Sequence, residues 1–370
     1  MRYICGDCQR TYPMDSHSYR CQCGGLFRLE YDKKRLSFDS LHENSFDRSL
    51  WRYREAMPPL SVPSIARTTM GEGGTPLVSI DRSELGKVEY MMPTLSFKDR
   101  GAVVLVAAME QFGIKSCAID SSGNAGTAVA AYCARVGIGC EVFVPSHTSD
   151  KKIAQIHAHG AVVHKIAGTR EDTANAALAH VDSTGSFYAS HIFNPLFWEG
   201  TKTYIYELFE QMGRKLPDAL VIPVGNGTLL MGVGIALMEL KEWGYVDTFP
   251  SVIAVQAANC APLAVAGMAG SDAVRQIPTS PTIAEGIASA APARGKEILA
   301  MMKQMGGRFV TVSEQSIIAA QEMLAKRGLF VESTSAANHA GYLEALKKGF
   351  VTPDTQVVVP LCGAGLKSVH

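Results

Sequence analysis

A lysine in a short polar turn is the first residue whose position suggests chemistry. Lys98 lies in the segment Ser96-Phe97-Lys98-Asp99-Arg100-Gly101, directly before the apolar run 102–109. This pattern predicts a buried helix that begins at the lysine, where the helix dipole and the loss of solvent lower the pKa of an amine. An unprotonated amine attacks carbonyl carbon, so we interpret Lys98 as a Schiff-base lysine for an aldehyde cofactor. Most lysines are simply exposed charges, and the interpretation therefore depends on the other motifs.

Four cysteines near the N-terminus indicate a second kind of chemistry. Cys5 and Cys8 are followed, after twelve residues, by Cys21 and Cys23, which places four thiols in two tight turns. Such spacing is typical of a structural zinc site, and it predicts a zinc knuckle over residues 1–30. The second pair is one residue shorter than the usual C-x-x-C, so free thiols are the alternative, and His17 is a possible substitute ligand.

The composition limits the classes of function. The chain has 370 residues, of which 47% are hydrophobic, which is enough for about two domains. Lys plus Arg and Asp plus Glu both number 35, and this balance favours neither a nucleic acid nor an anionic membrane as partner. No apolar stretch has the length of a membrane span, and the N-terminus has no apolar core of signal-peptide length. Nine cysteines without a secretory signal indicate the reducing cytoplasm.

The elements that position Lys98 alternate between strand and helix. Strands are predicted at 116–120, 140–145 and 161–165, with helices after each, and further strands at 219–224, 251–256 and 355–361. This alternation predicts an α/β fold with parallel sheets covered by helices. Two strand-to-helix turns are rich in small residues, at 121–127 and 225–228, and such turns bind anions or cofactors at the carboxyl edge of a sheet.

Several motifs occur together in the order seen in threonine synthases. The chain thus resembles the fold type II pyridoxal-phosphate (PLP) enzymes from Gly71 to Lys367, and its start is similar to that of the short, archaeal-type threonine synthases. The motifs are Gly71-Glu-Gly-Gly-Thr-Pro-Leu77, Ser96-Phe-Lys-Asp-Arg-Gly101, Ser121-Ser-Gly-Asn124, Asn194-Pro-x-x-x-Glu-Gly-x-Lys-Thr203, Val224-Gly-Asn-Gly227, Glu332-Ser-Thr-Ser-Ala-Ala337 and Cys362-Gly-Ala-Gly-Leu-Lys367.

The resemblance implies a domain plan. It predicts two open twisted sheets with helices on both faces, after the knuckle at 1–30. Residues 31–105 and 190–370 would form a large PLP-binding domain, and residues 106–189 a smaller mobile domain. A homodimer is expected.

The resemblance also assigns roles in cofactor binding. Lys98 would hold PLP covalently and carry protons at the substrate carbons, and Asn124 would hydrogen-bond the ring oxygen. Cys362 would lie beside the pyridine nitrogen, where a neutral thiol favours elimination over transamination. The phosphate would be bound by the turn Gly225, Asn226, Gly227 and Thr228.

Other residues are assigned to the substrate. The turn Ser121, Ser122 and Gly123 would receive its carboxylate, and Ser96 would also bind the substrate. Possible partners for a further anion are Arg100, His191, Lys202 and His147.

Three positions depart from the threonine synthase pattern near the expected phosphate of O-phosphohomoserine. Phe197 stands where the family presents an arginine, and His191-Ile192 replaces an Asn-Ser pair. A phenyl ring cannot replace a charge-assisted hydrogen bond to phosphate. The sequence therefore predicts that O-phosphohomoserine is a poor substrate.

The resemblance implies a PLP-dependent lyase or synthase that eliminates or replaces a β- or γ-leaving group on an amino acid. Three activities stay open: threonine synthase, cysteate synthase-type replacement on O-phosphoserine, and threonine or serine ammonia-lyase. The alternative from another class is a PLP-binding regulatory homologue without turnover.

Overall fold

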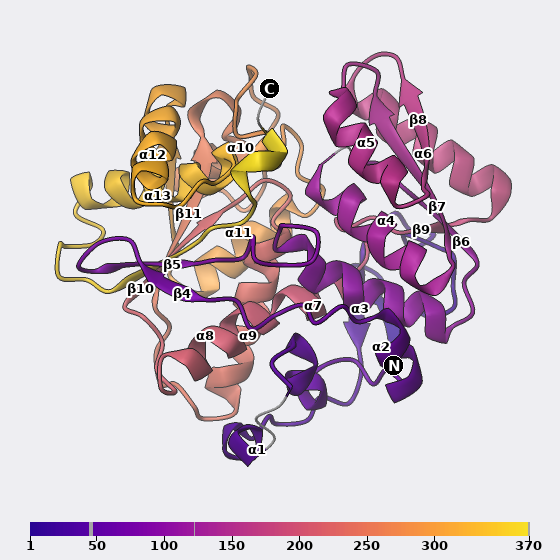
Figure 1. The fold of residues 1–370 in the computed structure, drawn as a ribbon, viewed down its shortest axis with the longest axis horizontal. Coiled ribbons are helices and arrows are strands. Elements are labelled where there is room, and N and C mark those ends of the chain that lie inside the picture. The colour runs from indigo at the N-terminus through magenta and orange to yellow at the C-terminus, as the bar shows by residue number, and fades with distance from the viewer. Residues whose placement is uncertain (44–46, 122, 369–370) are drawn as a thin grey trace. The chain divides into compact units, whose positions relative to one another are not determined.

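The computed structural model describes residues 1–43, 47–121 and 123–368, and the chain divides into two compact units (Figure 1). Unit 1 comprises residues 1–73 and 98–200, and unit 2 comprises residues 74–97 and 201–370. The predicted domain boundaries at 105 and 190 fall inside unit 1. This follows because helix α3 (Lys98–Gln111) packs against α2 (Val62–Thr68) and α4 (Asn124–Val136), which both belong to unit 1.

Unit 1 begins with a small antiparallel sheet in the order β2-β1-β3. Its strands are β1 (Arg2–Cys5), β2 (Thr11–Tyr12) and β3 (Phe27–Glu30). The segment after it contains α1 (Phe38–Glu43) and the 3-10 helix η1 (Leu50–Ala56). Trp51 and Tyr53 in this segment are buried, and Trp51 Nε1 donates to Glu72 Oε1 at 2.8 Å. Aromatic burial makes this segment part of the packed interior of unit 1.

The larger sheet of unit 1 is parallel, in the order β8-β7-β6-β9. The consecutive β6 residues Cys117, Ala118 and Ile119 are all fully buried, so both faces of this strand are covered. The remaining elements are β6 (Ser116–Ile119), β7 (Gly139–Pro145), α5 (Asp150–Ala158), β8 (Val162–Ile166), α6 (Arg170–Thr184), β9 (Phe187–Tyr188) and α7 (Leu196–Thr201).

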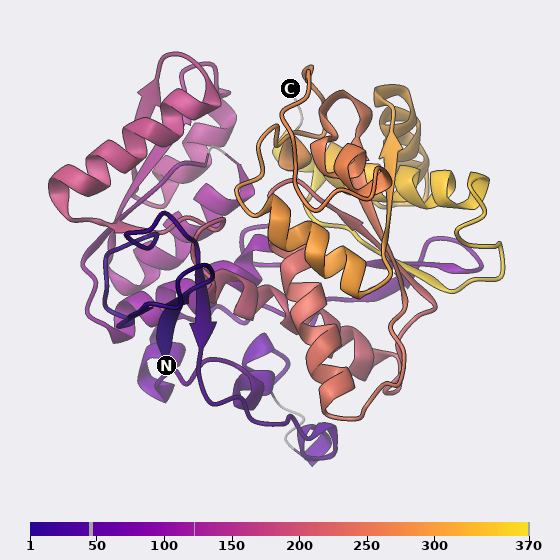
Figure 2. The ribbon, with the colours of Figure 1, turned by 180° about the vertical axis from the view of Figure 1, so that it is seen from behind.

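Unit 2, whose ribbon is seen from behind in Figure 2, contains a six-stranded sheet. Its strand order is β12-β11-β10-β13-β5-β4, and it is parallel except for the edge strand β4. Leu220, Val221 and Ile222 of its central strand are fully buried, which again requires helices on both faces. Helix α13 packs against β10, β11, β12 and β13. The elements are β4 (Leu77–Ser79), β5 (Glu84–Lys87), α8 (Thr203–Gln211), β10 (Ala219–Pro223), α9 (Thr228–Glu242), β11 (Ser251–Ala257), α10 (Pro262–Met268), α11 (Gly295–Gln304), β12 (Arg308–Val312), α12 (Glu314–Lys326), α13 (Ser333–Lys347) and β13 (Val357–Pro360).

The expected α/β class with helix-covered parallel sheets is confirmed. Across the described residues, no helix is both long and apolar enough to cross a membrane.

Candidate active site

Lys98 is the first residue of α3, as the sequence predicted. Its side chain is half-buried, and its Nζ lies 5.7 Å from the centre of the Phe197 ring. Gly101 permits this packing, since a Cβ at that position would lie 2.0 Å from the ring. Arg100, two residues after Lys98, is fully buried. Residue 197 is therefore a close neighbour of the candidate catalytic lysine.

His191 lies against the same aromatic ring. The centres of the His191 and Phe197 rings are 5.8 Å apart, and His191 is buried. Its Nδ1 has no hydrogen-bond partner among the described residues. Burial, with help from the charges of Lys98 and Arg170, holds the pKa of His191 well below its usual value, so the imidazole is neutral at pH 7.

The predicted turn at residues 121–127 lies in unit 1 and leads from β6 into α4. Asn124 is the first residue of α4, and Gly123 precedes it in extended backbone. Gly126 packs directly on the carbonyl oxygen of Ser121, which would lie 1.9 Å from a Cβ at that position. Only glycine allows the helix to begin so close to the strand end. Ser122 lies outside the described residues.

Asp120, which directly precedes this turn, and Tyr188 of β9 contact each other, and neither was predicted as a site residue. The Tyr188 hydroxyl donates to Asp120 Oδ1 at 2.6 Å, and burial raises the pKa of both groups. Asp120 could have been predicted as a site residue, because it is an acidic residue at the carboxyl end of a predicted strand. Tyr188 is brought there by β9, which pairs with β6 and could not be placed from the sequence.

In unit 2 the glycine turn follows β10 and opens α9. Gly227 has φ of 77°, a conformation that glycine adopts without strain, and α9 starts at Thr228. A Cβ at Gly225 would lie 2.9 Å from the Ile287 Cα, so a side chain there would collide with backbone. Asn226 Oδ1 accepts a hydrogen bond from Ser289 Oγ at 2.9 Å. The turn thus presents the amino end of a fifteen-residue helix, which attracts phosphate.

Cys362 follows β13 and lies beside the segment that leads to Lys98. Its carbonyl accepts from the Phe97 backbone N–H at 2.9 Å, and Ser96 bridges to Gly363. Its Sγ is buried and receives a weak contact from Asn338 Nδ2 at 3.9 Å. The Ser96 hydroxyl is buried and has no hydrogen-bond partner among the described residues. A buried, unsatisfied hydroxyl favours the presence of a ligand there.

Lys202 is placed differently from the other candidates. It is fully buried, and its Nζ pairs with Glu239 Oε1 at 3.2 Å. Tyr206 donates to the same carboxylate. This ion pair within unit 2 favours a structural role for Lys202, because its charge is already balanced by protein.

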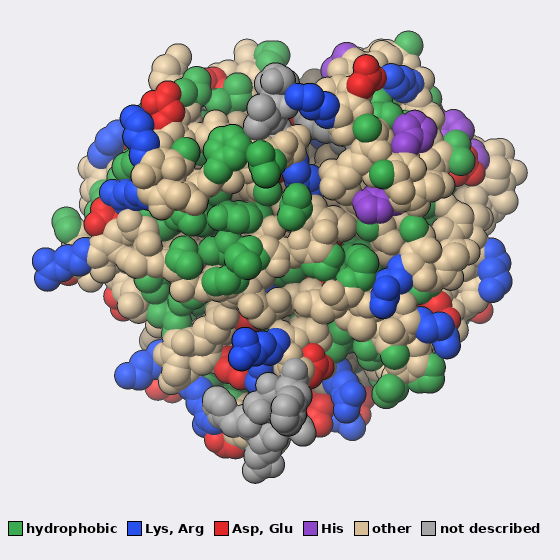
Figure 3. Space-filling view, in the orientation of Figure 1, with side chains coloured by type: hydrophobic (Ala, Val, Ile, Leu, Met, Phe, Trp, Pro, Cys, Tyr) green, Lys and Arg blue, Asp and Glu red, His purple; other side chains and the backbone are tan. Residues whose placement is uncertain are grey.

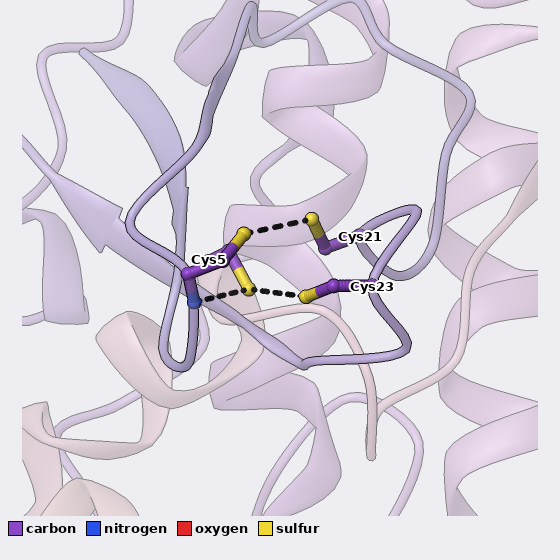
Figure 4. Close-up of side chains that lie close together, drawn as sticks. Cys5, Cys21 and Cys23 are labelled. Carbon is purple, nitrogen blue, oxygen red and sulfur yellow. Dashed lines mark hydrogen bonds between the residues drawn. The ribbon is translucent and has the colours of Figure 1, made fainter.

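The four N-terminal cysteines lie close together, and Figure 4 shows Cys5 near Cys21 and Cys23. Their sulfur atoms all lie within 4.8 Å of one another, with Cys5 to Cys23 and Cys8 to Cys21 both at 3.5 Å. Hydrogen bonds from the Cys23 backbone and the Tyr12 hydroxyl lower the pKa of Cys21 to about 6. A metal ion with four bonds to sulfur of about 2.3 Å separates the sulfurs by about 3.8 Å, so the cluster could hold a metal.

Comparison with known proteins shows the family to which this chain belongs. Residues 68–363 match the family described as pyridoxal-phosphate dependent enzyme. The chain belongs to this family. Two archaeal threonine synthases are similar to it along nearly the whole chain: that of Methanocaldococcus jannaschii is 31% identical, covering 98% of this chain and 92% of the relative, and that of Methanosarcina acetivorans is 33% identical, covering 98% and 91%.

Solved structures agree on the fold. Threonine deaminase isoform 2 from Solanum lycopersicum has a TM-score of 0.70 at 21% identity, covering 92% of this chain and 88% of that chain. The L-serine ammonia-lyase of Rhizomucor miehei has a TM-score of 0.67 at 24% identity, covering 78% and 93%. The family match and the threonine synthase relatives make the protein a PLP-dependent, threonine synthase-like enzyme.

The residues present suit PLP. Lys98 offers an amine at a helix start, the Gly225–Thr228 turn offers backbone N–H groups at another, and the Ser96 hydroxyl is buried without a partner among the described residues.

Proposed function

We propose that this enzyme eliminates a neutral hydroxyl group from a hydroxy amino acid, as a threonine or serine ammonia-lyase does. The observation that carries the proposal is the Phe197 ring, buried 5.7 Å from Lys98 Nζ at the position of the family's phosphate-binding arginine. Neutral His191 lies against the same ring. A phosphate dianion placed there would lose hydration and meet a phenyl ring where threonine synthases present an arginine, whereas a hydroxyl group could hydrogen-bond His191 Nδ1.

Each residue has a role in this reaction. When bound, PLP withdraws electrons from the substrate's α-carbon. Lys98 binds the cofactor and moves the α-proton, and Asn124 orients the cofactor ring. Ser121, Ser122 and Gly123 receive the substrate carboxylate. The β-hydroxyl leaves as water with a proton, and hydrolysis of the product then gives ammonia and a 2-oxo acid.

Residues of unit 2 complete the assignment. The Gly225–Thr228 turn binds the cofactor phosphate, and its helix dipole favours the negative charge. Cys362 would be the residue that faces the pyridine nitrogen of the cofactor, where a thiol in place of a carboxylate favours elimination. The Ser96 hydroxyl, which is buried without a partner among the described residues, would donate a hydrogen bond to the substrate.

The first experiment compares substrates on the purified holoenzyme. We expect L-threonine or L-serine to shift the cofactor absorbance and to release 2-oxo acid. With O-phosphohomoserine, phosphate release should be lower in kcat/KM by roughly 30- to 4000-fold than in a true threonine synthase, as for a lost charge partner worth about 2–5 kcal/mol. Phe197→Arg should recover part of the phosphate release, while Phe197→Leu, the matched control, should not.

Threonine synthase is the second candidate, since relatives at 31–33% identity bear that name. Ordinary rates of threonine formation from O-phosphohomoserine by the unmodified enzyme would establish it, and buried Arg100 would then be the first residue to test as the phosphate ligand. A cofactor absorbance that shifts with no amino acid tested would favour a regulatory homologue without turnover.

Lys98 provides a direct test of the covalent assignment. Lys98→Ala should keep the fold, measured by circular dichroism, but lose both the absorbance of lysine-bound cofactor and turnover. Lys115→Ala is the matched control, because Lys115 is an exposed lysine of the same unit. Turnover by the Lys98 variant would overturn the assignment.

We further propose that Cys5, Cys8, Cys21 and Cys23 bind one structural zinc ion. Four thiolates complete a tetrahedral shell and leave no position for substrate. Metal analysis should find one zinc per chain, which Cys5→Ser with Cys8→Ser abolishes while Cys260→Ser leaves it in place. Stoichiometric zinc in the double variant would refute the ligand set.

The protein is proposed to be a cytoplasmic homodimer. Free cysteines support a reducing compartment. Hydrophobic side chains gather around the 3-10 helix Gly365–Ser368 of unit 2 (Figure 3), and Leu366 and Phe330 are 77% and 44% exposed. Leu366→Glu should therefore produce a monomer in sedimentation experiments, whereas Ile318→Glu, a change at another exposed residue of unit 2, should not. An unchanged mass for the Leu366 variant would place the interface elsewhere.

A further inference from the structure

Three further cysteines meet inside unit 1, away from the N-terminal cluster. Cys117 comes from β6, Cys133 from α4 and Cys140 from β7. Their sulfur atoms all lie within 4.8 Å of one another, and those of Cys117 and Cys133 are 3.6 Å apart. The register of the parallel sheet accounts for part of this geometry, because Cys117 and Cys140 are direct partners on adjacent strands.

The spacing suits a single central atom. Three bonds to sulfur of about 2.3 Å, at angles of about 100° to 120°, separate the sulfurs by about 3.5–4.0 Å. The thiols therefore need small side-chain shifts, and no movement of the strands, to share one ion. Three sulfur donors select a soft, thiophilic ion.

Burial narrows the choice of ion. Cys117 and Cys133 are fully buried and Cys140 is 8% exposed, so a coordinated water is disfavoured and three ligands must suffice. An apolar interior also penalises net charge. Three thiolates leave a net charge of −2 with a monovalent ion and −1 with a divalent ion, but they neutralise a trivalent one.

We propose that Cys117, Cys133 and Cys140 form a three-thiolate site for trivalent arsenic, taken up from arsenite. In this reaction, As(OH)₃ and three thiols give As(SR)₃ and three waters. Three As–O and three S–H bonds break, three As–S and three O–H bonds form, and no atom changes oxidation state. Trivalent arsenic forms three bonds, and its lone pair occupies the remaining position around the atom. It therefore needs no water ligand, which suits this buried site.

The site rests on the fold of unit 1 and not on the proposed function. Because the sulfurs are buried, arsenite enters only when β6, α4 and β7 open locally, and binding should be slow. Once bound, arsenic links the three elements and should raise the midpoint of thermal unfolding.

The experiment uses the full-length holoenzyme in a phosphine reductant, with a variant in which Cys5, Cys8, Cys21 and Cys23 are all replaced by serine as the background that removes the competing N-terminal thiols. The zinc-loaded holoenzyme, whose N-terminal thiols are occupied by zinc, is measured in parallel. After incubation with arsenite and gel filtration, we expect one arsenic per chain in that background. X-ray absorption should show three sulfur neighbours and no oxygen.

Two variants that preserve the fold isolate the site. Cys133→Ala places a strong helix former in an alanine-rich helix, and Cys140→Val suits a strand. Each should lower arsenic affinity by at least about tenfold, a typical loss for an impaired metal site, and remove the thermal shift. Cys260→Ala, the matched buried control in unit 2, should change neither.

Three outcomes would overturn the proposal. The first is no retained arsenic in the background protein, which would mean that these thiols only pack. The second is equal retention after Cys133→Ala and Cys140→Val. The third is preferential retention of Cu(I) or Zn²⁺ over arsenite by the same thiols, which would refute the charge argument.

Discussion

Replacing Lys202 with methionine separates a structural role from substrate binding. Lys202 and Glu239 have side chains that are 0% and 4% exposed, and their charged atoms are 3.2 Å apart. Removing the ammonium group leaves a buried carboxylate that still accepts from Tyr206 but has lost this cation. Breaking a buried pair by removing one partner costs about 3–5 kcal/mol, so we expect Lys202→Met to reduce the free energy of unfolding by that amount.

Urea titration followed by circular dichroism measures this effect. Lys202→Met with Glu239→Gln should regain a large part of the loss, because the amide carries no unpaired charge. Lys303→Met is the matched control: Lys303 pairs with Asp272 at the same 3.2 Å, but the side chains are 74% and 76% exposed, and the change should cost less than about 1 kcal/mol. A Lys202→Met enzyme of unchanged stability and strongly raised KM would refute the structural role and return Lys202 to the substrate site.

Buried groups of unit 1 give three further predictions. The folded protein keeps the pKa of His191 well below the ordinary 6.5, so the unfolded chain binds more protons than the folded one below that pH. The free energy of unfolding should therefore fall as pH drops from about 6.5, by at most about 1.4 kcal/mol per pH unit for this group. Denaturant titrations of His191→Gln should show a shallower fall. Gly200→Ala should abolish soluble folded protein in expression tests, since the new Cβ would lie 1.9 Å from the Arg100 carbonyl oxygen, whereas Gly137→Ala, at a φ of 73° with open space, should cost only about 1 kcal/mol. The Glu72 carboxylate accepts hydrogen bonds from Trp51, Thr69 and Tyr132. In a urea titration, Glu72→Leu should lower the free energy of unfolding by at least about 2 kcal/mol, and Glu72→Gln should lower it less, because the amide oxygen remains an acceptor. Equal losses of stability in the two variants would contradict this.

The local elements and the position of Lys98 could be predicted from residue pattern alone. Apolar runs such as 219–224 and 251–256 predicted central strands, because a strand buried on both faces needs continuous hydrophobic residues. The lysine before the run 102–109 predicted a helix start, and α3 begins at Lys98. Cysteine spacing predicted the N-terminal cluster, whose members are close in sequence and converge in space.

Contacts between distant residues required the folded chain. Folding placed Phe197 and His191 near Lys98, and it gave Lys202 a buried partner in Glu239, 37 residues away in sequence. It also brought together Cys117, Cys133 and Cys140, which no spacing rule connects. Local pattern reports the periodicity of one element, whereas these contacts depend on how strands pair and helices pack. That pairing is set by burial summed over a whole sheet, so side chains far apart in the chain meet only once the sheet order exists.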